Sequence, residues 1–545
     1  MPLSYSTKRR RDAQFSARCD SLPDEQFGGS GVHRPALKAL QTQLSGHIVL
    51  PGEAGYDEGR KLSNPAFNFH PMAIIYCLTE ADVAEALQTA RMTGLPFAIR
   101  SGGHCTAGFS GSNGLMIDVK GLAGILIDPV GSTATVGCGA EWGQFQQTLD
   151  PYGLHVPGGE CSDVCVGGYV QGGGFGFTCA TFGMSCDNVN EVRVMLADGS
   201  IVVANADQNA DLLWAVCGGT GGNFGVLLTV KFALQKFRTA YGFALTWSLN
   251  SPSNIATAAQ AMMTLQASYM LNSICGSDMT LQIHMGFQNV GAAGAMEPFL
   301  MVRGLYAGDP ALGPKMIAPL KALPGVLQPV SWEQVDSFYV LNKMLLERPQ
   351  GMPPMPPGPD PLEDKSSHYV SRALTLAEWT AMLTMVTTSV PNRAFGYLEV
   401  YGGAINAAPP LSNAFIHRTS AFNLVMDVFW KDSSDRLASE QFLARWNQLV
   451  EAYWNGEVYQ NYPSVVDPDY AMKYWGGAYS ILQRVKAKYD PFTFFVFAQG
   501  VVGDPGAQLP DNTPPQVVAA LKLAPALAGG LAPPDTISVH PHAGA

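Results

Sequence analysis

Long apolar runs are absent from this sequence of 545 residues. No stretch approaches the roughly 20 apolar residues that a membrane-spanning helix requires. The apolar core of a secretory signal peptide is missing too, because the basic residues 8–11 are followed by the polar segment 12–27. We therefore expect a cytoplasmic protein without a membrane partner, in which the basic cluster is solvated or disordered.

Positive charge is also scarce, since 33 Lys and Arg stand against 44 Asp and Glu and give a formal net charge of -11. A surface that binds nucleic acid needs clustered basic residues, so we expect no nucleic-acid partner. The ten cysteines have no regular spacing, which argues against a disulfide framework and for reduced thiols. The cysteines at 161, 165, 179 and 186 also lack the paired Cys-x2-Cys spacing of zinc sites, so we expect no metal.

What the sequence does have is a globular composition, 47% hydrophobic and 14% charged. Between about residues 73 and 226, short β-rich runs alternate with helical stretches. Strands are predicted at 72–78, 96–100 and 115–119, a strand and a helix within 132–153, and a hairpin at 190–205 that turns at Asp198-Gly199. Residues 79–94 predict a helix with Thr79 as N-cap and Gly94 as its stop. This mixture indicates an α+β fold.

The texture changes from about residue 238 to residue 450. A long helix is predicted at 254–271, and strands at 279–287 and 395–403. The Pro-rich segment 348–365 predicts an exposed loop, because proline is excluded from helix interiors and central strands. The residues after about 504 are rich in Pro, Ala and Gly, and we expect them to extend over the surface or fray.

Glycines cluster in two places. The run RSGGH, residues 100–104, follows a predicted strand, and six glycines fall within residues 167–176. Ordered glycines lose conformational entropy, so such a cluster predicts backbone amides packed against a group such as a pyrophosphate; a flexible loop is the alternative. A P-loop is excluded because no lysine follows, and the dinucleotide pattern G-x-G-x-x-G fails at Phe177.

Three blocks of sequence together carry a family resemblance. RSGGH, ECSDVCVGGYVQGGGFG (residues 160–176) and YWGGAYSILQRVKAKYDPFTFF (474–495) resemble the vanillyl-alcohol-oxidase superfamily of FAD enzymes, and within it the berberine-bridge-enzyme-like oxidases. The resemblance implies a two-part FAD-binding domain of the PCMH type, residues 51–237 and 456–545, around a substrate domain, residues 238–455, with an antiparallel sheet covered by helices. Residues 1–50 are then an N-terminal extension.

The resemblance also implies how FAD is held. His104 would carry the flavin through its 8α-methyl group, and Cys161 would form a second bond to C6. Val164 is the small residue that would leave oxygen a path to the flavin, whereas Asp163 and Cys165 depart from the family pattern. The remaining residues implied to bind FAD are Arg100, Ser101, Gly102, Gly103, Val166, Gly167, Gly168, Gly172, Gly173, Gly174, Gly176, Gly225, Val226 and Asn461.

The catalytic candidates are Tyr462 and Glu399. Tyr462 lies in a segment similar to the family's N-Y-x-D, although Ser464 replaces the aspartate and the nearest carboxylate is Asp467. A phenol is a poor base at neutral pH and needs a neighbour. Strand alternation places Glu399 on one face between two tyrosines. The resemblance to sugar-oxidising relatives implies that it pairs with Tyr462; a solvated strand glutamate is the alternative.

The predicted function is an FAD-dependent oxidase. It would transfer hydride from an alcohol or similar C–H group of a carbohydrate or secondary metabolite to covalent flavin, with O2 reduced to H2O2. Alkaloid ring closure is less favoured, because the next strand has no carboxylate before Asp427. A flavin dehydrogenase of the same fold and a flavoprotein that only sequesters a ligand remain alternatives. The substrate and the oligomeric state stay open.

Overall fold

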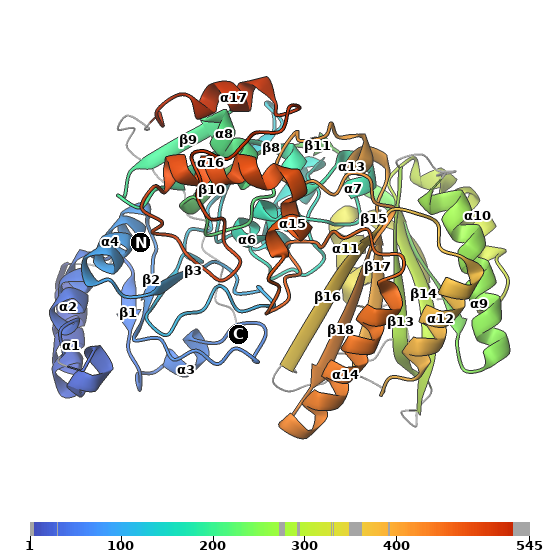
Figure 1. Ribbon diagram of the computed structural model, residues 1–545, viewed down its shortest axis with the longest axis horizontal. Coiled ribbons are helices and arrows are strands. Elements are labelled where there is room, and N and C mark those ends of the chain that lie inside the picture. The colour runs from blue at the N-terminus through green and yellow to red at the C-terminus, as the bar shows by residue number, and fades with distance from the viewer. Residues whose placement is uncertain are drawn as a thin grey trace.

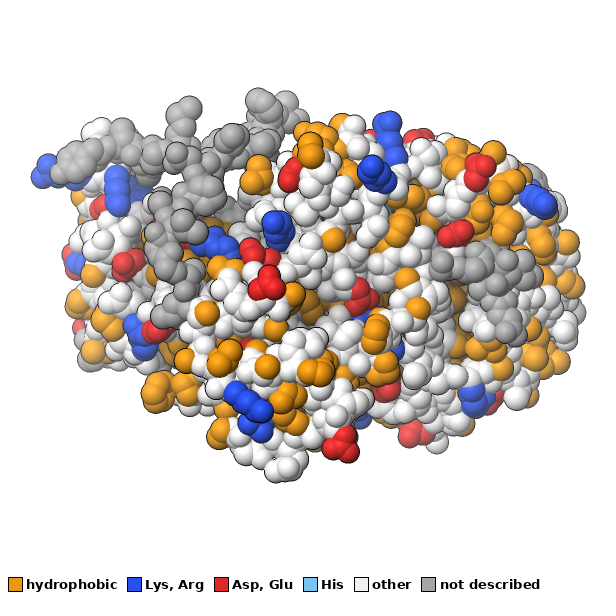
Figure 2. Space-filling view, turned by 90° about the horizontal axis from the view of Figure 1, so that it is seen from above, with side chains coloured by type: hydrophobic (Ala, Val, Ile, Leu, Met, Phe, Trp, Pro, Cys, Tyr) orange, Lys and Arg blue, Asp and Glu red, His pale blue; other side chains and the backbone are white. Residues whose placement is uncertain are grey.

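The computed structural model describes residues 5–271, 278–290, 295–347 and 362–526, apart from residues 30, 329, 331, 391 and 392. Figure 1 shows two units beside each other, one built from the N-terminal half together with the C-terminal segment, the other from a large sheet with its helices. On the face shown in Figure 2, basic side chains lie scattered among acidic and apolar ones. Within the described residues, no helix is long and apolar enough to cross a bilayer.

The first unit contains a four-stranded sheet in the order β1-β2-β4-β3. Its strands are β1 (His47–Val49), β2 (Ala73–Tyr76), β3 (Phe97–Arg100) and β4 (Leu115–Asp118). Helix α4 (Glu80–Thr93) connects β2 to β3, and both these strands run parallel to β4. Thr79 caps α4 through the Asp82 amide, and Gly94 ends it with φ 65°, which confirms both predicted helix signals.

A second, antiparallel sheet of the first unit has the order β5-β6-β10-β8-β9. Its strands are β5 (Ile125–Asp128), β6 (Thr133–Gly137), β8 (Val189–Met195), β9 (Ile201–Asn205) and β10 (Val226–Ala233). The predicted hairpin is confirmed, since β8 pairs with β9 and Gly199 takes φ 87° at the turn. The short strands β7 (Leu154–His155) and β11 (Gln235–Lys236) pair beside it. The helices here are α3 (Tyr56–Gly59), α5 (Trp142–Leu149), α6 (Val166–Gln171), α7 (Cys179–Phe182) and α8 (Ala210–Val216).

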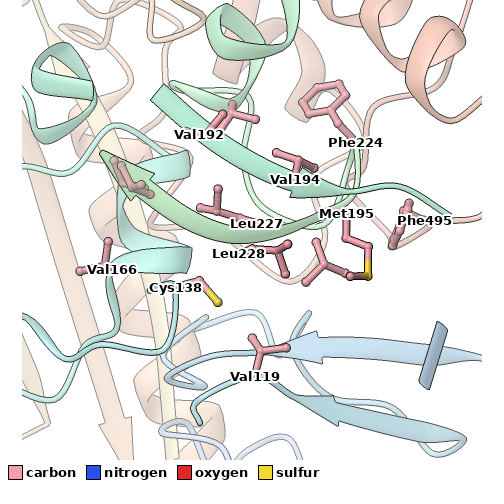
Figure 3. Close-up of a cluster of buried hydrophobic side chains, with 14 of the residues drawn as sticks. Val119, Cys138, Val166, Val192, Val194, Met195, Phe224, Leu227, Leu228 and Phe495 are labelled. Atoms are coloured by element: carbon pink, nitrogen blue, oxygen red, sulfur yellow. The ribbon is translucent and has the colours of Figure 1, made fainter. Parts of the chain in front are cut away.

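Apolar side chains fill the space between the two sheets of the first unit. Figure 3 shows Val192, Val194 and Leu227 of the second sheet on one side and Val119, which follows β4, on the other. Phe495 of the C-terminal segment joins this cluster, and all five side chains are buried. Burying each such side chain contributes roughly 1.5–3 kcal/mol, so the C-terminal segment is held to the first unit by the same core.

The second unit is a seven-stranded antiparallel sheet in the order β15-β12-β14-β13-β17-β18-β16. Its strands are β12 (Thr239–Ser248), β13 (Met279–Val290), β14 (Ala295–Tyr306), β15 (Trp332–Ser337), β16 (Leu362–Val370), β17 (Ala394–Val400) and β18 (Phe422–Trp430). Helices α9 (Pro252–Leu265), α10 (Gly313–Lys321), α12 (Leu376–Thr387) and α14 (Ser433–Val450) lie on the side of the sheet away from the first unit (Figure 1). The predicted α+β fold, with its helix-covered antiparallel sheet, is confirmed.

The remaining helices come from both units. Helix α11 (Phe338–Glu347) follows β15, and α13 (Gly403–Ala407) follows β17. The C-terminal segment returns as α15 (Tyr470–Trp475), α16 (Tyr479–Tyr489) and α17 (Pro515–Leu521). In α16 the buried Lys486 ammonium pairs with Asp490 at 2.5 Å and donates to the carbonyls of Asn223 and Phe495 at 2.6 and 2.7 Å.

Three local expectations were wrong in part. The basic cluster lies in helix α1 (Tyr5–Ser21), where Arg11 donates to the carbonyls of Gln41 and Leu44 beside helix α2 (Arg34–Gln43). The end of the Pro-rich segment is not a loop, because residues 362–365 begin edge strand β16; residues 348–361 lie outside the described residues. The tail forms α17, whose Val517 is buried in the core of the first unit, while residues 527–545 are not described.

Candidate active site

A cavity of about 720 Å³ is lined by residues of both units. Its walls include the turn after β3, the loop before α6, the start of β10, strands β13 and β16–β18, and residues around 460 and 497. Sites for small molecules and cofactors have volumes of about 300–1,000 Å³ and combine apolar walls with a few polar groups. The cavity therefore has the size and position of a combined cofactor and substrate site.

His104 and Cys161 both line this cavity. His104 ends the turn that follows β3, where Gly103 takes φ 74° and its carbonyl accepts the Ser63 amide at 3.1 Å. Cys161 lies in the loop before α6, with its side chain open to the cavity. Burial, followed by the charges of Glu160 and Asp163, raises the pKa of the Cys161 thiol to about 11. The thiolate is thus disfavoured at this position.

The residues implied to bind FAD fall into two groups. Those that line the cavity, besides His104 and Cys161, are Ser101, Gly102, Gly103, Val164, Gly167, Gly168, Gly225, Val226 and Asn461. Those that lie behind its wall are Arg100, Val166, Gly172, Gly173, Gly174 and Gly176. Arg100 is paired with Asp118 at 2.7 Å, and a Cβ on Gly176 would lie 2.0 Å from the Gly158 carbonyl oxygen. These positions shape the wall by close packing.

Bare backbone faces the cavity at several of the lining glycines. A Cβ on Gly168 would meet nothing nearer than Ser101 Oγ at 3.9 Å, and one on Gly222, where φ is +77°, nothing nearer than Phe497 at 3.7 Å. A side chain at either position would project into the space, so these glycines form a cradle that a large group can approach closely. With the nucleophiles of His104 and Cys161 on the same wall, the residues present fit a covalently held FAD.

The catalytic candidates, Tyr462 and Glu399, also line the cavity and are hydrogen-bonded to each other. Tyr462 Oη donates to Glu399 Oε1 at 2.7 Å, and Asn423 Nδ2 donates to Glu399 Oε2 at 3.0 Å. Glu399 on β17 stands directly opposite Asn423 on β18, which sets the second bond. Glu399 is only 2% exposed, so the alternative of a solvated strand glutamate is wrong.

The surroundings of these two side chains raise the pKa of both the Glu399 carboxyl and the Tyr462 phenol. Burial raises the pKa of Glu399 to about 7, against the hydrogen bonds from Tyr462 and Asn423, which lower it. Burial, reinforced by the charge of Glu399, raises the pKa of Tyr462 well above its usual value. Near neutral pH, Glu399 is therefore the group of the pair that exchanges a proton readily.

Lys365 is a cavity residue that sequence reasoning missed. Its ammonium lies 4.7 Å from the centre of the Tyr462 ring and 3.3 Å from Asp427, which stands opposite Lys365 across β16 and β18. Burial raises the pKa of Asp427 to about 7 despite this cation. Lys365 falls in the segment expected to be a Pro-rich loop, so the sequence offered no reason to place it in a sheet.

Arg303 and Glu160 form a second unforeseen pair in the wall. Arg303 Nη2 lies 2.5 Å from Glu160 Oε2, and the Gln282 amide also donates to Glu160. Arg303 on β14 is 3% exposed, and its ion pair joins the large sheet to the loop that carries Cys161. A single arginine within the apolar run FLMVRGLY was the one signal that might have marked this position.

Other candidates lie elsewhere. Asp467 pairs with Lys473 at 2.7 Å and does not line the cavity. Tyr401, the residue that follows β17, shares a hydrogen bond of 2.8 Å with Tyr369 in the core. Within the described ranges, no group of three or more His, Cys, Asp or Glu side chains is arranged to hold a metal ion.

Two family models match the chain. Residues 71–205 match the FAD binding domain, and residues 458–502 match the model described as berberine and berberine like. Both matched ranges contribute to the cavity, the first through His104 and Cys161 and the second through Tyr462.

Relatives cover nearly the whole of the chain. A carbohydrate oxidase of Microdochium nivale is 30% identical over 504 residues, which is 86% of this chain and 95% of the relative. An uncharacterized FAD-linked oxidoreductase of Bacillus subtilis (strain 168) is 27% identical over 477 residues, 84% of this chain and 98% of the relative. The solved structure of Physcomitrella patens BBE-like 1 superimposes with a TM-score of 0.73 at 24% identity, covering 85% of this chain and 98% of that one.

Proposed function

Because the chain belongs to the berberine bridge enzyme-like family of FAD-linked oxidoreductases, we propose that it oxidises a hydroxyl-bearing carbon of a carbohydrate, with FAD bonded to His104 and Cys161. The observation that carries the proposal is the Tyr462–Glu399 hydrogen bond, which lies in the same cavity as both nucleophiles. FAD, when bound, supplies the acceptor for a hydride and passes the electrons on to O2.

The protein's own part in this reaction is proton transfer. The substrate hydroxyl gives its proton to Tyr462 as the C–H bond breaks, and the Tyr462 proton moves along its hydrogen bond to Glu399. Asn423 holds the Glu399 carboxylate in place from the neighbouring strand. Lys365, whose ammonium lies over the ring of Tyr462, stabilises negative charge that develops on the phenol as it releases its proton.

The chemistry of the wall supports a carbohydrate. Polar groups from Gln282, Arg303 and Lys365 stand among the aromatic rings of Phe395 and Tyr397. Hydroxyl groups need such donors and acceptors, and flat rings pack against the C–H faces of a sugar. The relation to the Microdochium nivale carbohydrate oxidase favours the same class of substrate.

Flavin attachment is tested first. The protein should stay yellow after acid precipitation, and its intact mass should include FAD. His104→Ala and Cys161→Ala should each keep one bond, whereas the double variant should release FAD into the supernatant. Wild-type protein that loses its flavin to acid would refute the covalent attachment.

The substrate is tested by anaerobic flavin bleaching with a panel of mono- and oligosaccharides, with alcohols lacking a sugar ring as controls. Bleaching by at least one sugar, and recovery of colour with formation of H2O2 when air is admitted, is the expected result. Bleaching without recovery in air would instead identify a dehydrogenase. A flavin that no sugar bleaches would overturn the proposed oxidation of carbohydrates.

A further inference from the structure

Asp163 touches the histidine that the proposed function assigns to flavin attachment. Its Oδ2 lies 3.2 Å from His104 Nε2, although the two residues come from separate loops, one before α6 and one after β3. Both side chains line the cavity, that of Asp163 being 64% exposed and that of His104 28%. Asp163 is also one of the two residues that depart from the family pattern in this run, so the contact belongs to this chain in particular.

We propose that Asp163 is a positioning residue for flavin attachment, which binds the Nε2–H of His104 and leaves Nδ1 as the nucleophile. The inference rests on the proposed bond between His104 and FAD. A neutral imidazole has one N–H donor and one lone pair, and the partner of the N–H decides which nitrogen carries the lone pair. A carboxylate accepts only, so Asp163 selects the tautomer with hydrogen on Nε2.

The attachment step balances with O2 as the oxidant. A C–N bond forms between Nδ1 and the 8α-carbon, and one C–H bond of the 8α-methyl group breaks. The two electrons released in this oxidation of the methyl carbon reduce the flavin ring, and O2 then takes them and two protons to give H2O2. Positive charge develops on the imidazole as Nδ1 forms its bond. The Asp163 carboxylate, to which the Nε2 proton is directed, stabilises this charge.

The same carboxylate has the opposite effect on the second nucleophile. Asp163 lies two residues after Cys161, and with Glu160 it adds negative charge beside that thiol. Negative charge disfavours a thiolate, which is the reactive form of cysteine. Asp163 thus assists bond formation at His104 and hinders it at Cys161. Simple damage to the loop would slow both bonds, so the two effects together distinguish positioning from a structural role.

The test measures each bond separately. Full-length Cys161→Ala and His104→Ala chains, made by translation in a flavin-free mixture, receive excess FAD in air, and acid-stable flavin is followed with time. Each background is compared with and without Asp163→Asn. The matched control is Asp207→Asn, which removes an exposed carboxylate outside the cavity. Melting temperature and reversible FAD binding verify that the variants fold.

In the Cys161→Ala background, Asp163→Asn should slow attachment by about 10²-fold, the size of a typical general-base effect. In the His104→Ala background it should leave attachment unchanged or faster, and Asp207→Asn should change neither rate. Equal rates with and without Asp163→Asn in the Cys161→Ala background would overturn the inference while leaving His104 attachment intact. Slowing in both backgrounds would overturn it as well. A Cys161→Ala chain that attaches no flavin at all would refute the His104 bond itself.

Discussion

At the scale of single residues, the proposed function has Tyr462 and Glu399 share the role of one base. A phenol with a raised pKa does not hold an ionised oxygen near neutral pH, whereas a carboxyl with a pKa of about 7 gains and loses a proton there. Since Tyr462 donates its proton to Glu399, the phenol can receive the substrate proton only as it releases its own. In the proposed reaction we therefore expect the pair to work as a relay and not as a preformed tyrosinate.

Substitution of either residue should reveal the relay. Tyr462→Phe should slow flavin reduction by about 10²–10⁴-fold, because no group then receives the substrate proton. Glu399→Gln should cost less, since Gln still accepts the phenol hydrogen bond. The double variant should be little slower than Tyr462→Phe, because residues that act as a unit are not additive. The measurement is the stopped-flow rate of anaerobic flavin bleaching.

Two outcomes would contradict the relay. Rates that multiply independently in the double variant would show that the residues act separately. A Tyr462→Phe enzyme with the wild-type reduction rate would remove Tyr462 from the mechanism. Acid-stable flavin must be unchanged in every variant, so that each rate refers to a fully loaded enzyme.

Val164 also belongs to the scale of single residues, because its small size is what we expect to give O2 access to the flavin. It lines the cavity three residues after Cys161, where we expect a small side chain to leave O2 a path to the flavin. Val164→Leu should slow reoxidation by about tenfold, or about 1.4 kcal/mol in the barrier, while reduction by substrate stays nearly unchanged. Mixing reduced enzyme with aerated buffer measures this.

The control for that experiment is Val496→Leu, which adds the same methylene to another residue of the cavity wall. It should alter neither half-reaction. If Val164→Leu slows reduction and reoxidation equally, Val164 shapes the cavity in general and does not control oxygen.

At the scale of elements, the pairing of β17 with β18 contributes to the acidity of Glu399, whose pKa burial raises most. The register places Glu399 opposite Asn423, and the amide hydrogen bond stabilises the ionised carboxylate against burial. Burial has raised the pKa to about 7, so Glu399 is neutral below that pH and ionised above it. Only the ionised form accepts the proton, and activity should therefore rise with pH through this range.

The pH dependence of flavin reduction should follow from this pairing. The rate should fall by about tenfold per pH unit below pH 7 and level off above it, as one required deprotonation dictates. Asn423→Ala removes a donor to a charged group, typically about 1.5–3 kcal/mol, so the limb should move upward by about 1–2 pH units. A profile that Asn423→Ala leaves in place would separate Asn423 from the acidity of the base. Glu399→Gln should abolish the limb altogether.

Elements also show what the sequence could predict and what it could not. Local signals were sufficient for α4, whose Thr79 cap and Gly94 stop depend only on neighbouring backbone, and for the β8–β9 hairpin. Strand alternation placed Glu399 on one face of its strand but could not show which residue of the neighbouring strand would contact it. The contact with Asn423 depends on register between strands, and the contacts of Lys365 depend on an edge strand that proline content concealed. Arg303 and Glu160 meet across two units, which no local pattern records.

At the scale of the whole molecule, the cavity lies where the two units meet, and polar contacts both at its wall and away from it join them. Asn64 donates to the Glu363 carbonyl at 2.9 Å, and Arg418 pairs with Asp187 at 2.6 Å. Arg303 and Glu160 add a buried ion pair, which contributes little net stability once its desolvation is counted. A cofactor that contacts both units would add to the coupling that these protein contacts already supply.

The last prediction tests this coupling through thermal stability. In the His104→Ala/Cys161→Ala double variant, FAD binds reversibly, so the melting temperature should rise with added FAD; at 100 times the Kd the gain is about 2.7 kcal/mol. The melting temperature of wild-type protein should not respond to added FAD, because its flavin is already bonded. Differential scanning fluorimetry over a series of FAD concentrations measures both, with AMP as a control ligand that lacks the flavin ring. A wild-type melting temperature that moves with added FAD would contradict permanent attachment. A double variant that ignores FAD would mean that the cavity walls alone do not hold the cofactor, and the two units would then owe their arrangement to the protein contacts across the cavity.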